Sequence, residues 1–560
     1  MSKHPHFFCP IKAHPMKTPA ALFATVALLV SAFTARADFD LLIKNGRVFS
    51  GASADTPLVA ADIGITGDRI VALAPHLTGP AQRTIDAAGL IVSPGFIDLH
   101  AHIEPLPEDR AAQSALRQGV TLVVGNPDGG GPVDLKALTT KLETQGFGPN
   151  AAYLIGHNSV RAQVMGMENR APTADELAAM QALVATGMTD GAFGLSTGLI
   201  YLPGTFSTFE EIVALAQVAA RHGGIYTSHL RAEGLGLIDG VTEAIKIGET
   251  ARIPVILTHH KAVGKQMWGA SEKSLALVDA ARARGLDVMI DQYPYTATST
   301  SLRVLIPSWA VAGDAAGLSG RFAQRLKDPA QRAQIEKEIA FNLLNDRGGG
   351  DLSRIQFSRF SWKPSLDGKT MHDWALAEDR PPNVATGVDL VIQGELHGGA
   401  SCIYHVLAEE DVERIMRHPQ TMIASDGRLS QPGKDHPHPR AYGTFPRVLG
   451  EYVRERKTLT LTQALYKMTG QPARRLGLTD RGRLEVGCYA DLALFDPATV
   501  AAQSTFERPH QYPVGIPYVI VNGRVTFDET GYHDLRAGRI IRNPAYAPAA
   551  PAPSVTPKVD

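Results

Sequence analysis

Eight short apolar segments, most of them followed by a stretch rich in alanine and leucine, occupy the middle of this chain. They are FIDLHAH, TLVVGNPDG, AAYLIGHN, GAFGLSTGLIY, GIYTSHLR, PVILTHHK, DVMIDQYPY and MIASDG. Strand-like segments that alternate with amphipathic helix-like segments are typical of a parallel sheet covered by helices. Eight such units make a (β/α)8 TIM-type barrel, whose active site lies at the C-terminal ends of its strands. We therefore predict an α/β fold with a barrel over residues 94–478.

Short strand-like segments separated by glycine-rich turns lie on both sides of the predicted barrel, at residues 38–93 and 479–545. Strands that are distant in sequence can share a sheet, so we expect the two regions to form one small β-sandwich. The longest interruption of the barrel pattern, at about residues 302–419, lies between the seventh and eighth strands. A segment of this length predicts an insertion over the barrel mouth that acts as a lid.

The first 37 residues have the pattern of a secretory signal peptide. Lys17, next to a second possible start at Met16, precedes an apolar stretch at residues 20–33, and a small-x-small motif ends at Ala37. This pattern predicts cleavage near Ala37 and a periplasmic or secreted protein. A buried helix or a membrane anchor is the alternative, but the apolar run is short for a span, so no stable span is expected after cleavage.

The composition excludes some partners and crosslinks. Lys plus Arg number 55 and Asp plus Glu number 56, with no strongly basic block, so nucleic acid is not an expected partner. After signal cleavage only Cys402 and Cys488 remain, which is too few for a disulfide framework. The Pro- and Ala-rich residues 546–560 predict a disordered tail.

Four of the predicted strands end in residues that can bind a metal ion. His100 and His102 are two residues apart on the first strand, so both side chains point to one face. His229, His259 and Asp426 each follow a later apolar run. A lone histidine at a strand end is more often a hydrogen-bonded structural residue, but five such residues in strand order favour a metal site. Imidazoles with a carboxylate are the ligands of catalytic zinc, so we predict one or two zinc ions.

The predicted ligands also suggest a chemistry. Zinc lowers the pKa of a bound water to about 7. Asp426 would take the proton of that water and pass it to a departing amine, which is a poor leaving group until it is protonated. Asp426 could serve as a simple ligand, as the catalytic base, or as both.

Several motifs resemble a known family. PGFIDLHAH resembles the first-strand signature of the amidohydrolase superfamily. The chain is more specifically similar to N-acyl-D-amino-acid deacylases, the D-aminoacylases, in GAFGLSTGLIYLPG, SHLRAEG, LTHHKAVG, DQYPYTATST, ASDG, HPHPRAYGTFPRVLG and RAGRIIR. These motifs run from about residue 40 to residue 542. The resemblance implies zinc-dependent hydrolysis of the amide of a small-molecule N-acyl-D-amino acid, which releases a carboxylate and a free D-amino acid.

The resemblance also implies roles for individual residues. His229 and His259 correspond to the ligands of the tightly held zinc, whereas His100, His102 and Asp426 correspond to a weaker second site and the base. The residues implied to bind the substrate are Lys261, Tyr293, Ser299 and Arg440 at its carboxylate and Tyr201 near the scissile carbonyl. A cationic lysine and a forked guanidinium suit a free carboxylate.

One departure from the family concerns the turn after the second strand. Family members have a metal-binding cysteine there, but this chain has Pro127 in the sequence GNPDGGG. Asp128 or Glu104 could supply an oxygen ligand instead, or the position could have no protein ligand and the site a single zinc. An oxygen ligand in place of a thiolate would weaken the preference for zinc over harder ions.

Two other functions stay open at this level. An amidohydrolase with the same barrel and metal could act on a cyclic amide, a dipeptide-like compound or another N-acylated molecule. A non-catalytic relative could keep the barrel for binding, although such a protein would be expected to have lost metal ligands.

Overall fold

The computed structural model describes residues 39–314, 319–533 and 536–546. The predicted signal peptide lies outside the described residues, as does the predicted tail apart from Tyr546. Among the described residues, no helix combines the length and the apolar character that a membrane span requires.

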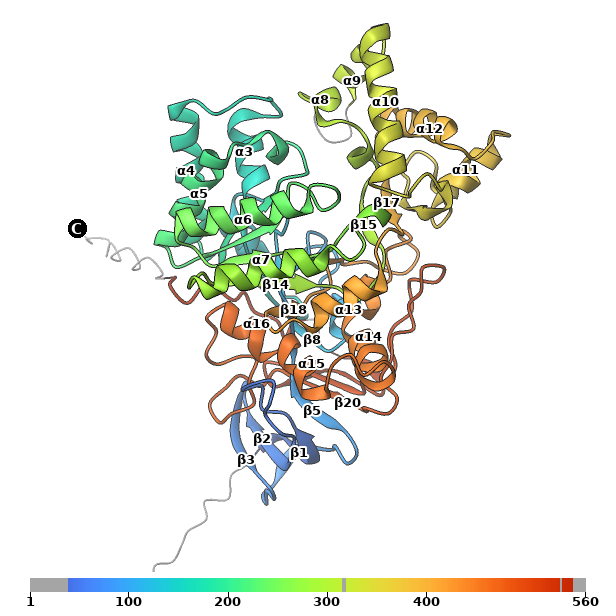
Figure 1. Ribbon diagram of the computed structural model, residues 1–560. Helices are drawn as coiled ribbons and strands as arrows, with labels where there is room; N and C mark the ends of the chain where they lie inside the picture. The colour runs from blue at the N-terminus through green and yellow to red at the C-terminus, as the bar shows by residue number, and fades with distance from the viewer. Residues whose placement is uncertain (1–38, 315–318, 534–535, 547–560) are drawn as a thin grey trace, which may run out of the picture. The chain divides into compact units, whose positions relative to one another are not determined.

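Eight parallel strands form the predicted barrel (Figure 1), which confirms the fold class. Strands that follow one another along the chain pair in parallel, from the first to the eighth. In chain order they are β6 (Phe96–Asp98), β8 (Val120–Gly125), β9 (Asn150–Tyr153) continued by β10 (Ile155–Gly156), β11 (Gly194–Gly198), β12 (Ile225–His229), β13 (Val255–Leu257), β14 (Val288–Gln292) and β18 (Thr421–Ile423).

The first and last strands meet at their C-terminal ends. There β7 (Ala101–His102) pairs in parallel with β19 (Gly427–Arg428). The Asp426 N–H also donates to the His100 carbonyl oxygen over 2.8 Å. The closure of the barrel therefore lies within the segments that carry the predicted metal ligands.

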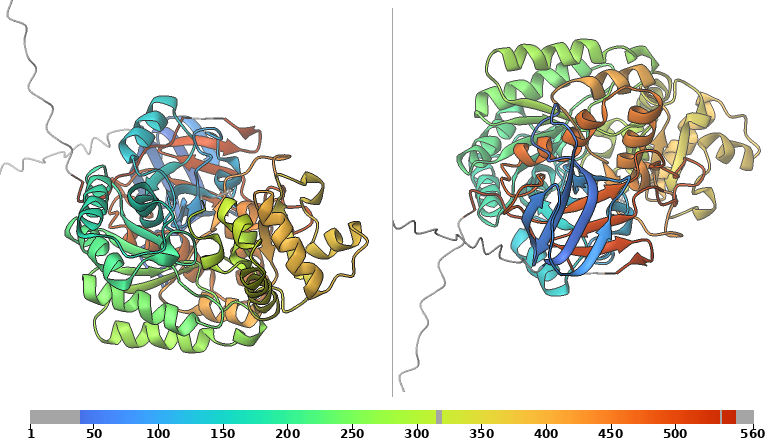
Figure 2. Two further views of the ribbon diagram at one scale, coloured as in Figure 1. Left: turned by 90° about the horizontal axis from the view of Figure 1, so that it is seen from above. Right: turned by 90° about the horizontal axis from the view of Figure 1, so that it is seen from below.

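Helices surround the strands on the outside, as the view from above shows (Figure 2). In chain order they are α1 (Gln113–Leu116), α2 (Leu135–Gln145), α3 (His157–Met165), α4 (Ala174–Thr189), α5 (Phe209–Arg221), α6 (Leu237–Ala251), α7 (Ser271–Ala283), α13 (Glu409–Arg417), α14 (Arg440–Arg447), the π-helical continuation Val448–Glu455, α15 (Leu461–Met468) and α16 (Gly470–Arg475).

Helix α5 shows why these segments are helical. The Thr208 side chain caps its N-terminus by accepting from the Glu211 N–H, which satisfies one of the free N–H groups of the first turn. Its buried positions include Ile212, Leu215 and Ala219, at the three- and four-residue spacing of one helix face. That face packs on the barrel strands.

Strands from both ends of the chain share one sheet, as predicted. The view from below shows the N-terminal strands beside the C-terminal strands (Figure 2), and antiparallel pairing of β5 with β20 joins the two sets. The sheet order is β23-β22-β21-β20-β5-β1-β2-β3, and β4 pairs with β1. The strands are β1 (Phe39–Val48), β2 (Val59–Thr66), β3 (Arg69–Ala74), β4 (Ala81–Asp86), β5 (Ile91–Pro94), β20 (Leu492–Phe495), β21 (Tyr518–Val521), β22 (Arg524–Asp528) and β23 (Gly531–Tyr532).

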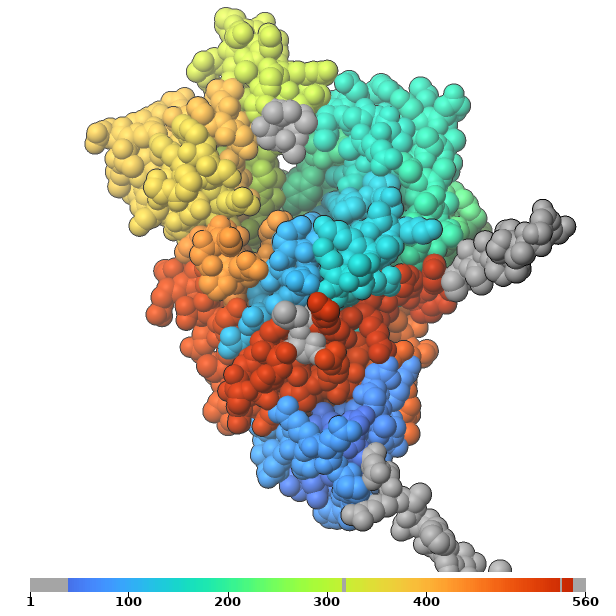
Figure 3. Space-filling view, turned by 180° about the vertical axis from the view of Figure 1, so that it is seen from behind, coloured from blue at the N-terminus to red at the C-terminus, as the bar shows by residue number. Residues whose placement is uncertain are grey.

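An insertion with its own apolar core lies between the seventh and eighth barrel strands (yellow in Figure 3). It differs at both ends from the predicted range of about 302–419. It starts at β15, because residues 298–301 pair with residues 401–404, and it ends before α13, which packs on α7 and β18 as a barrel helix. Its elements are β15 (Thr298–Ser301), α8 (Ser308–Val311), α9 (Gly320–Arg325), α10 (Pro329–Asn345), β16 (Ile355–Arg359), α11 (Met371–Ala377), α12 (Val384–Leu396) and β17 (Ser401–Tyr404).

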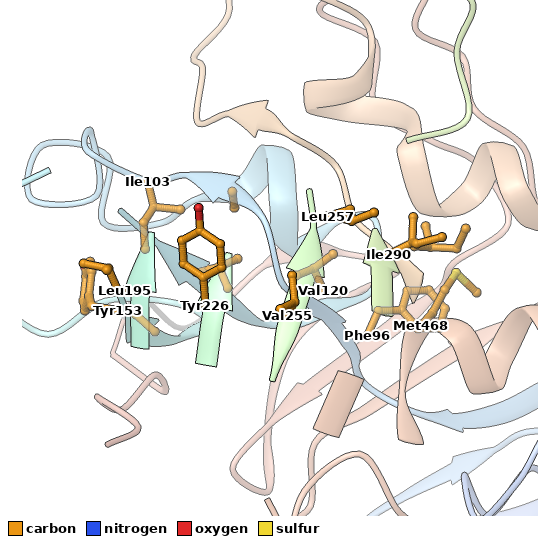
Figure 4. Close-up of a cluster of buried hydrophobic side chains, with 14 of the residues drawn as sticks. Phe96, Ile103, Val120, Tyr153, Leu195, Tyr226, Val255, Leu257, Ile290 and Met468 are labelled. Carbon is orange, nitrogen blue, oxygen red and sulfur yellow. The ribbon is translucent and has the colours of Figure 1, made fainter. Parts of the chain in front are cut away.

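Alternate residues of the barrel strands belong to two different apolar clusters. Tyr226 and Ile290 belong to a cluster that also contains helix residues, so it fills the layer between strands and helices (Figure 4). Their neighbours Ile225 and Met289 belong to a second cluster on the other face, inside the barrel. Both clusters are buried, and they hold the strand ends in place for the site.

Lys467 of α15 is a buried lysine next to the start of β18. Its Nζ donates to the carbonyl oxygens of His418, over 2.7 Å, and Thr421, over 2.9 Å. Burial lowers the pKa of Lys467 to about 7. Between about pH 7 and the ordinary lysine value near 10, the unfolded chain therefore binds a proton that the folded chain does not. The free energy of unfolding should rise with pH across this window because of Lys467.

We expect Lys467→Met to remove this pH dependence. The difference in unfolding free energy, variant minus wild type, should fall as pH rises from 7 to 10, by at most roughly 1.4 kcal/mol per pH unit. Chemical unfolding at several pH values measures it. Lys337→Met, a change at an exposed lysine of α10, is the control and should give a constant difference. A constant difference for Lys467→Met as well would contradict the prediction.

Candidate metal centre

The predicted metal-binding residues meet at the C-terminal end of the barrel. His100 and His102 follow β6, His229 ends β12, His259 follows β13 and Asp426 follows β18. All but His102 are at least nine-tenths buried. The structure therefore brings together all five residues that strand position singled out.

Asp128 lies at the centre of the four histidines. Its Oδ1 is 3.5 Å from His100 Nε2 and 3.3 Å from His259 Nε2. Its Oδ2 is 3.7 Å from both His102 Nε2 and His229 Nδ1. Asp128 has a φ of 54°, a left-handed backbone conformation that aspartate tolerates better than most residues, and this turn after β8 directs the carboxylate into the barrel mouth.

Asp426 faces the same ring nitrogens of His100 and His102 that Asp128 faces. Its Oδ1 is 3.2 Å from His102 Nε2 and 3.6 Å from His100 Nε2, while its Oδ2 is 2.8 Å from Arg440 Nη1. Burial acts to raise the pKa of Asp426, but the positive charge of Arg440 and the nearby histidines outweigh it and lower that pKa. Asp426 is therefore a carboxylate at neutral pH.

The ligand atoms form two groups that share Asp128. One contains His100, His102, Asp128 and Asp426, and the other Asp128, His229 and His259, with the atoms of each group within 4.8 Å of one another. Buried atoms without a hydrogen-bond partner among the described residues include Nε2 of His100 and His259, Nδ1 of His229 and Oδ1 of Asp128. Buried polar atoms normally have partners. Imidazole nitrogens that face a shared carboxylate in this way fit a pair of divalent metal ions such as zinc.

Glu104, the other candidate to replace the family cysteine, lies outside both groups. Its Oε1 is 3.2 Å from Nδ1 of His102, and its Oε2 is 3.3 Å from Arg428. Glu104 therefore contacts the ring nitrogen of His102 that faces away from Asp128. Of the two candidates, the structure places Asp128 among the ligand atoms.

Glu233 is a site residue that sequence reasoning missed. Its carboxylate is 3.4 Å from His229 Nε2, 3.2 Å from His259 Nδ1 and 2.6 Å from Lys261 Nζ. Burial acts to raise its pKa, but His229, Lys261 and His259 outweigh it and lower the pKa well below the ordinary value. Burial in turn lowers the pKa of Lys261. The sequence signal for Glu233 is its position four residues after His229, a predicted ligand.

Asp291 of β14 is a second residue without a predicted role. Its Oδ1 accepts a hydrogen bond from the His259 N–H over 2.6 Å and lies 3.9 Å from His100 Nδ1. His259 has a φ of 36°, so this bond supports a backbone conformation that a histidine rarely adopts. Asp291 thereby orients His259 toward Asp128.

The predicted substrate residues border two adjoining cavities. Tyr201, Lys261 and Tyr293 line a cavity of about 430 Å³ that also contains Asp128 and His229. Arg440 lines a neighbouring cavity of about 340 Å³ and stacks on Tyr293, with its guanidinium carbon 4.6 Å from the ring centre. Ser299 borders both cavities.

Tyr201 lies directly beside the metal ligands. Its ring centre is 4.6 Å from that of His229, and its hydroxyl accepts from Thr300 Oγ1 over 3.0 Å. Burial and the charge of Asp128 raise the pKa of Tyr201 well above 10. Its hydroxyl therefore keeps its proton and can donate to a ligand in the cavity.

Comparisons with known proteins agree with this geometry. A model described as Amidohydrolase family matches residues 395–527. A D-aminoacylase from Alcaligenes xylosoxydans xylosoxydans is 36% identical over 90% of this chain and 98% of its own length. An N-acyl-D-glutamate deacylase from the same organism is 35% identical over 91% and 98%.

Solved structures give the same result. The N-acyl-D-glutamate deacylase of Bordetella bronchiseptica, complexed with zinc and a phosphonate inhibitor, aligns with a TM-score of 0.76 at 32% identity over 90% of this chain and 100% of that one. A crystal structure of D-aminoacylase aligns with a TM-score of 0.75 at 35% identity over the same shares. The chain therefore belongs to the N-acyl-D-amino-acid deacylase, or D-aminoacylase, family of the amidohydrolase superfamily.

Proposed function

We propose that this protein hydrolyses the amide bond of N-acyl-D-amino acids with zinc as its cofactor and releases a carboxylate and a free D-amino acid. The observation that carries the proposal is the carboxylate of Asp128 among four histidines, next to a cavity with cationic groups. The relatives that match nearly their whole length are named for this activity.

The two groups of ligand atoms would hold the metal. His229, His259 and Asp128 would bind one zinc, and His100, His102, Asp128 and Asp426 would bind a second. When bound there, zinc acidifies a water and polarises the scissile carbonyl. Glu233 and Asp291 would fix the orientation of His229 and His259 through the contacts described above, as carboxylates behind metal-binding histidines commonly do.

Asp426 would transfer the proton, and Tyr201 would stabilise the carbonyl oxygen. The ionised Asp426 accepts a proton from the attacking water and delivers it to the amine nitrogen, without which the amine would leave slowly. Tyr201, whose hydroxyl stays protonated, donates a hydrogen bond to the carbonyl oxygen as negative charge develops there.

Four residues would position the substrate carboxylate. Lys261 and Arg440 supply positive charge, Tyr293 supplies a hydroxyl donor in the larger cavity, and Ser299 supplies one at the border of the two cavities. Within the protein Lys261 pairs with Glu233 and Arg440 with Asp426. These pairs hold both cations in place, and a carboxylate would bind the donors that remain on each.

We also propose that the protein is exported, on the pattern of its first 37 residues. The mass of the mature protein from the producing cell tests this, and a chain that retains residues 1–37 would contradict it.

A hydrolysis panel combined with metal analysis tests the proposed function. N-acetyl-D-methionine should be hydrolysed, its L-enantiomer and a cyclic amide far more slowly, and the sample should contain one or two zinc ions per chain. Chelation should remove the activity, and added zinc should restore it. Faster hydrolysis of the L-enantiomer or of the cyclic amide would contradict the substrate class, whereas full activity after removal of the metal would contradict the mechanism.

A further inference from the structure

Arg347 is a buried cation on the wall of the 430 Å³ cavity. The proposed function gives it no role. It belongs to the insertion, two residues after α10 ends, and only 2% of its surface is exposed. It lines the cavity together with Lys261, Glu233 and Tyr293. In Figure 3 the insertion, in yellow, and the helices in teal rise on either side of a hollow.

The turn that carries Arg347 is fitted against the loops of the metal centre. A Cβ atom at Gly234, next to Glu233, would lie 2.0 Å from Oδ1 of Asp346. A Cβ atom at Gly264 would lie 3.1 Å from the carbonyl oxygen of Asn345, and Gly264 has a φ of 90°. The φ of Gly264 requires glycine there, and a larger residue at position 234 would displace the Asp346 carboxylate, so the turn lies close to the loops after β12 and β13. Arg347 is therefore held beside the site and does not swing with a free loop.

The guanidinium of Arg347 has few partners of its own. Its nearest carboxylate is that of Asp346, whose Oδ2 is 3.2 Å from Nε and whose side chain is 24% exposed. No hydrogen bond to the guanidinium occurs within the described parts of the chain, and its buried Nε has none. The hydroxyl of Tyr293 is also buried without a partner.

The other two cations of the site face carboxylates of the metal centre, whereas Arg347 faces Asp346 of its own turn. Lys261 lies 2.6 Å from Glu233, and Arg440 lies 2.8 Å from Asp426. A guanidinium has five N–H donors in a fork that matches a carboxylate. A buried charge is costly unless it is paired and hydrogen-bonded. A carboxylate in the cavity would accept hydrogen bonds that the Arg347 guanidinium does not make within the described residues, where Asp346 is its ion-pair partner.

We propose that Arg347 binds a second carboxylate, the one on the side chain of an acidic N-acyl-D-amino acid, and so makes this protein selective for such substrates. This inference rests on the proposed function, which already uses Lys261, Arg440, Tyr293 and Ser299 for the α-carboxylate. Arg347 enters the cavity from the insertion, whereas Lys261 and Arg440 come from the loops after barrel strands. The insertion would thus select the side chain.

The test compares two substrates of nearly equal shape. Wild-type protein should hydrolyse N-acetyl-D-glutamate with a kcat/KM at least about tenfold above that for N-acetyl-D-glutamine, the range expected for a hydrogen bond to a charged group. Arg347→Met should lower kcat/KM for N-acetyl-D-glutamate by roughly 10- to 100-fold, mainly through KM, and leave N-acetyl-D-glutamine within about threefold. Arg347→Lys should keep part of the preference.

Arg354→Met is the matched control. Arg354 belongs to the same insertion, its side chain is 40% exposed and it lies near Asp351, so neither substrate should be affected. Equal losses on both substrates in Arg347→Met, or a wild-type protein without preference for N-acetyl-D-glutamate, would overturn the inference. If either of these results is obtained and N-acetyl-D-methionine is still hydrolysed, the inference about Arg347 fails and the proposed function stands. If the wild type hydrolyses no N-acyl-D-amino acid, the proposed function fails first.

Discussion

Asp426→Asn should lower kcat by roughly 10²- to 10⁴-fold, the usual contribution of a positioned acid–base group, and leave the metal at His229 and His259 in place. The amide keeps the shape of the carboxylate but cannot accept a proton from water. Its Oδ1 position, 3.2 Å from His102, would still offer an oxygen atom. Steady-state hydrolysis of the best panel substrate and zinc analysis of the same sample measure both quantities.

The control for this variant is Asp279→Asn, a carboxylate paired with His418 with its side chain 68% exposed. It should leave kcat and zinc content unchanged. An unchanged kcat in Asp426→Asn would remove Asp426 as the proton carrier. A loss of all bound zinc would instead show that Asp426 acts mainly as a ligand.

Repetition along the sequence made the barrel predictable. Each of the eight apolar runs is long enough to be a strand buried on both faces, and the eight barrel strands occupy these runs. His229 and Asp426 were recognisable because strand ends in a barrel converge, so position along the chain implied position in space. The shared sheet followed from similar strand-like segments at both ends.

Other site residues depend on packing that no local pattern expresses. Glu233 and Asp291 acquire their contacts only when loops after different strands come together. The start of the insertion depends on pairing between residues 298–301 and 401–404, about a hundred positions away. Arg347 is likewise an ordinary arginine in the sequence, and only its burial beside Lys261 and Tyr293 distinguishes it.

The central position of Asp128 leads to the second large effect. Because one carboxylate faces all four histidines, Asp128→Ala should weaken both groups of ligands at once. Loss of a charged ligand should reduce zinc affinity by at least about 10- to 100-fold, the loss typical even of the groups that support metal ligands. Zinc bound after dialysis against a weak chelator, read together with thermal unfolding, should fall well below the wild-type value, and hydrolysis should fall with it.

Asp128→Cys and Glu104→Ala make this prediction specific. A thiolate binds zinc well and prefers it over harder ions. Asp128→Cys should therefore retain zinc and bind manganese more weakly than the wild type does. Glu104 contacts Arg428 and the ring nitrogen of His102 that faces away from Asp128, so Glu104→Ala should keep the His229 and His259 ion. If Glu104→Ala loses zinc while Asp128→Ala keeps it, the oxygen that replaces the family cysteine is Glu104. If only Asp128→Ala loses it, Asp128 is the residue that supplies an oxygen ligand in place of the family cysteine.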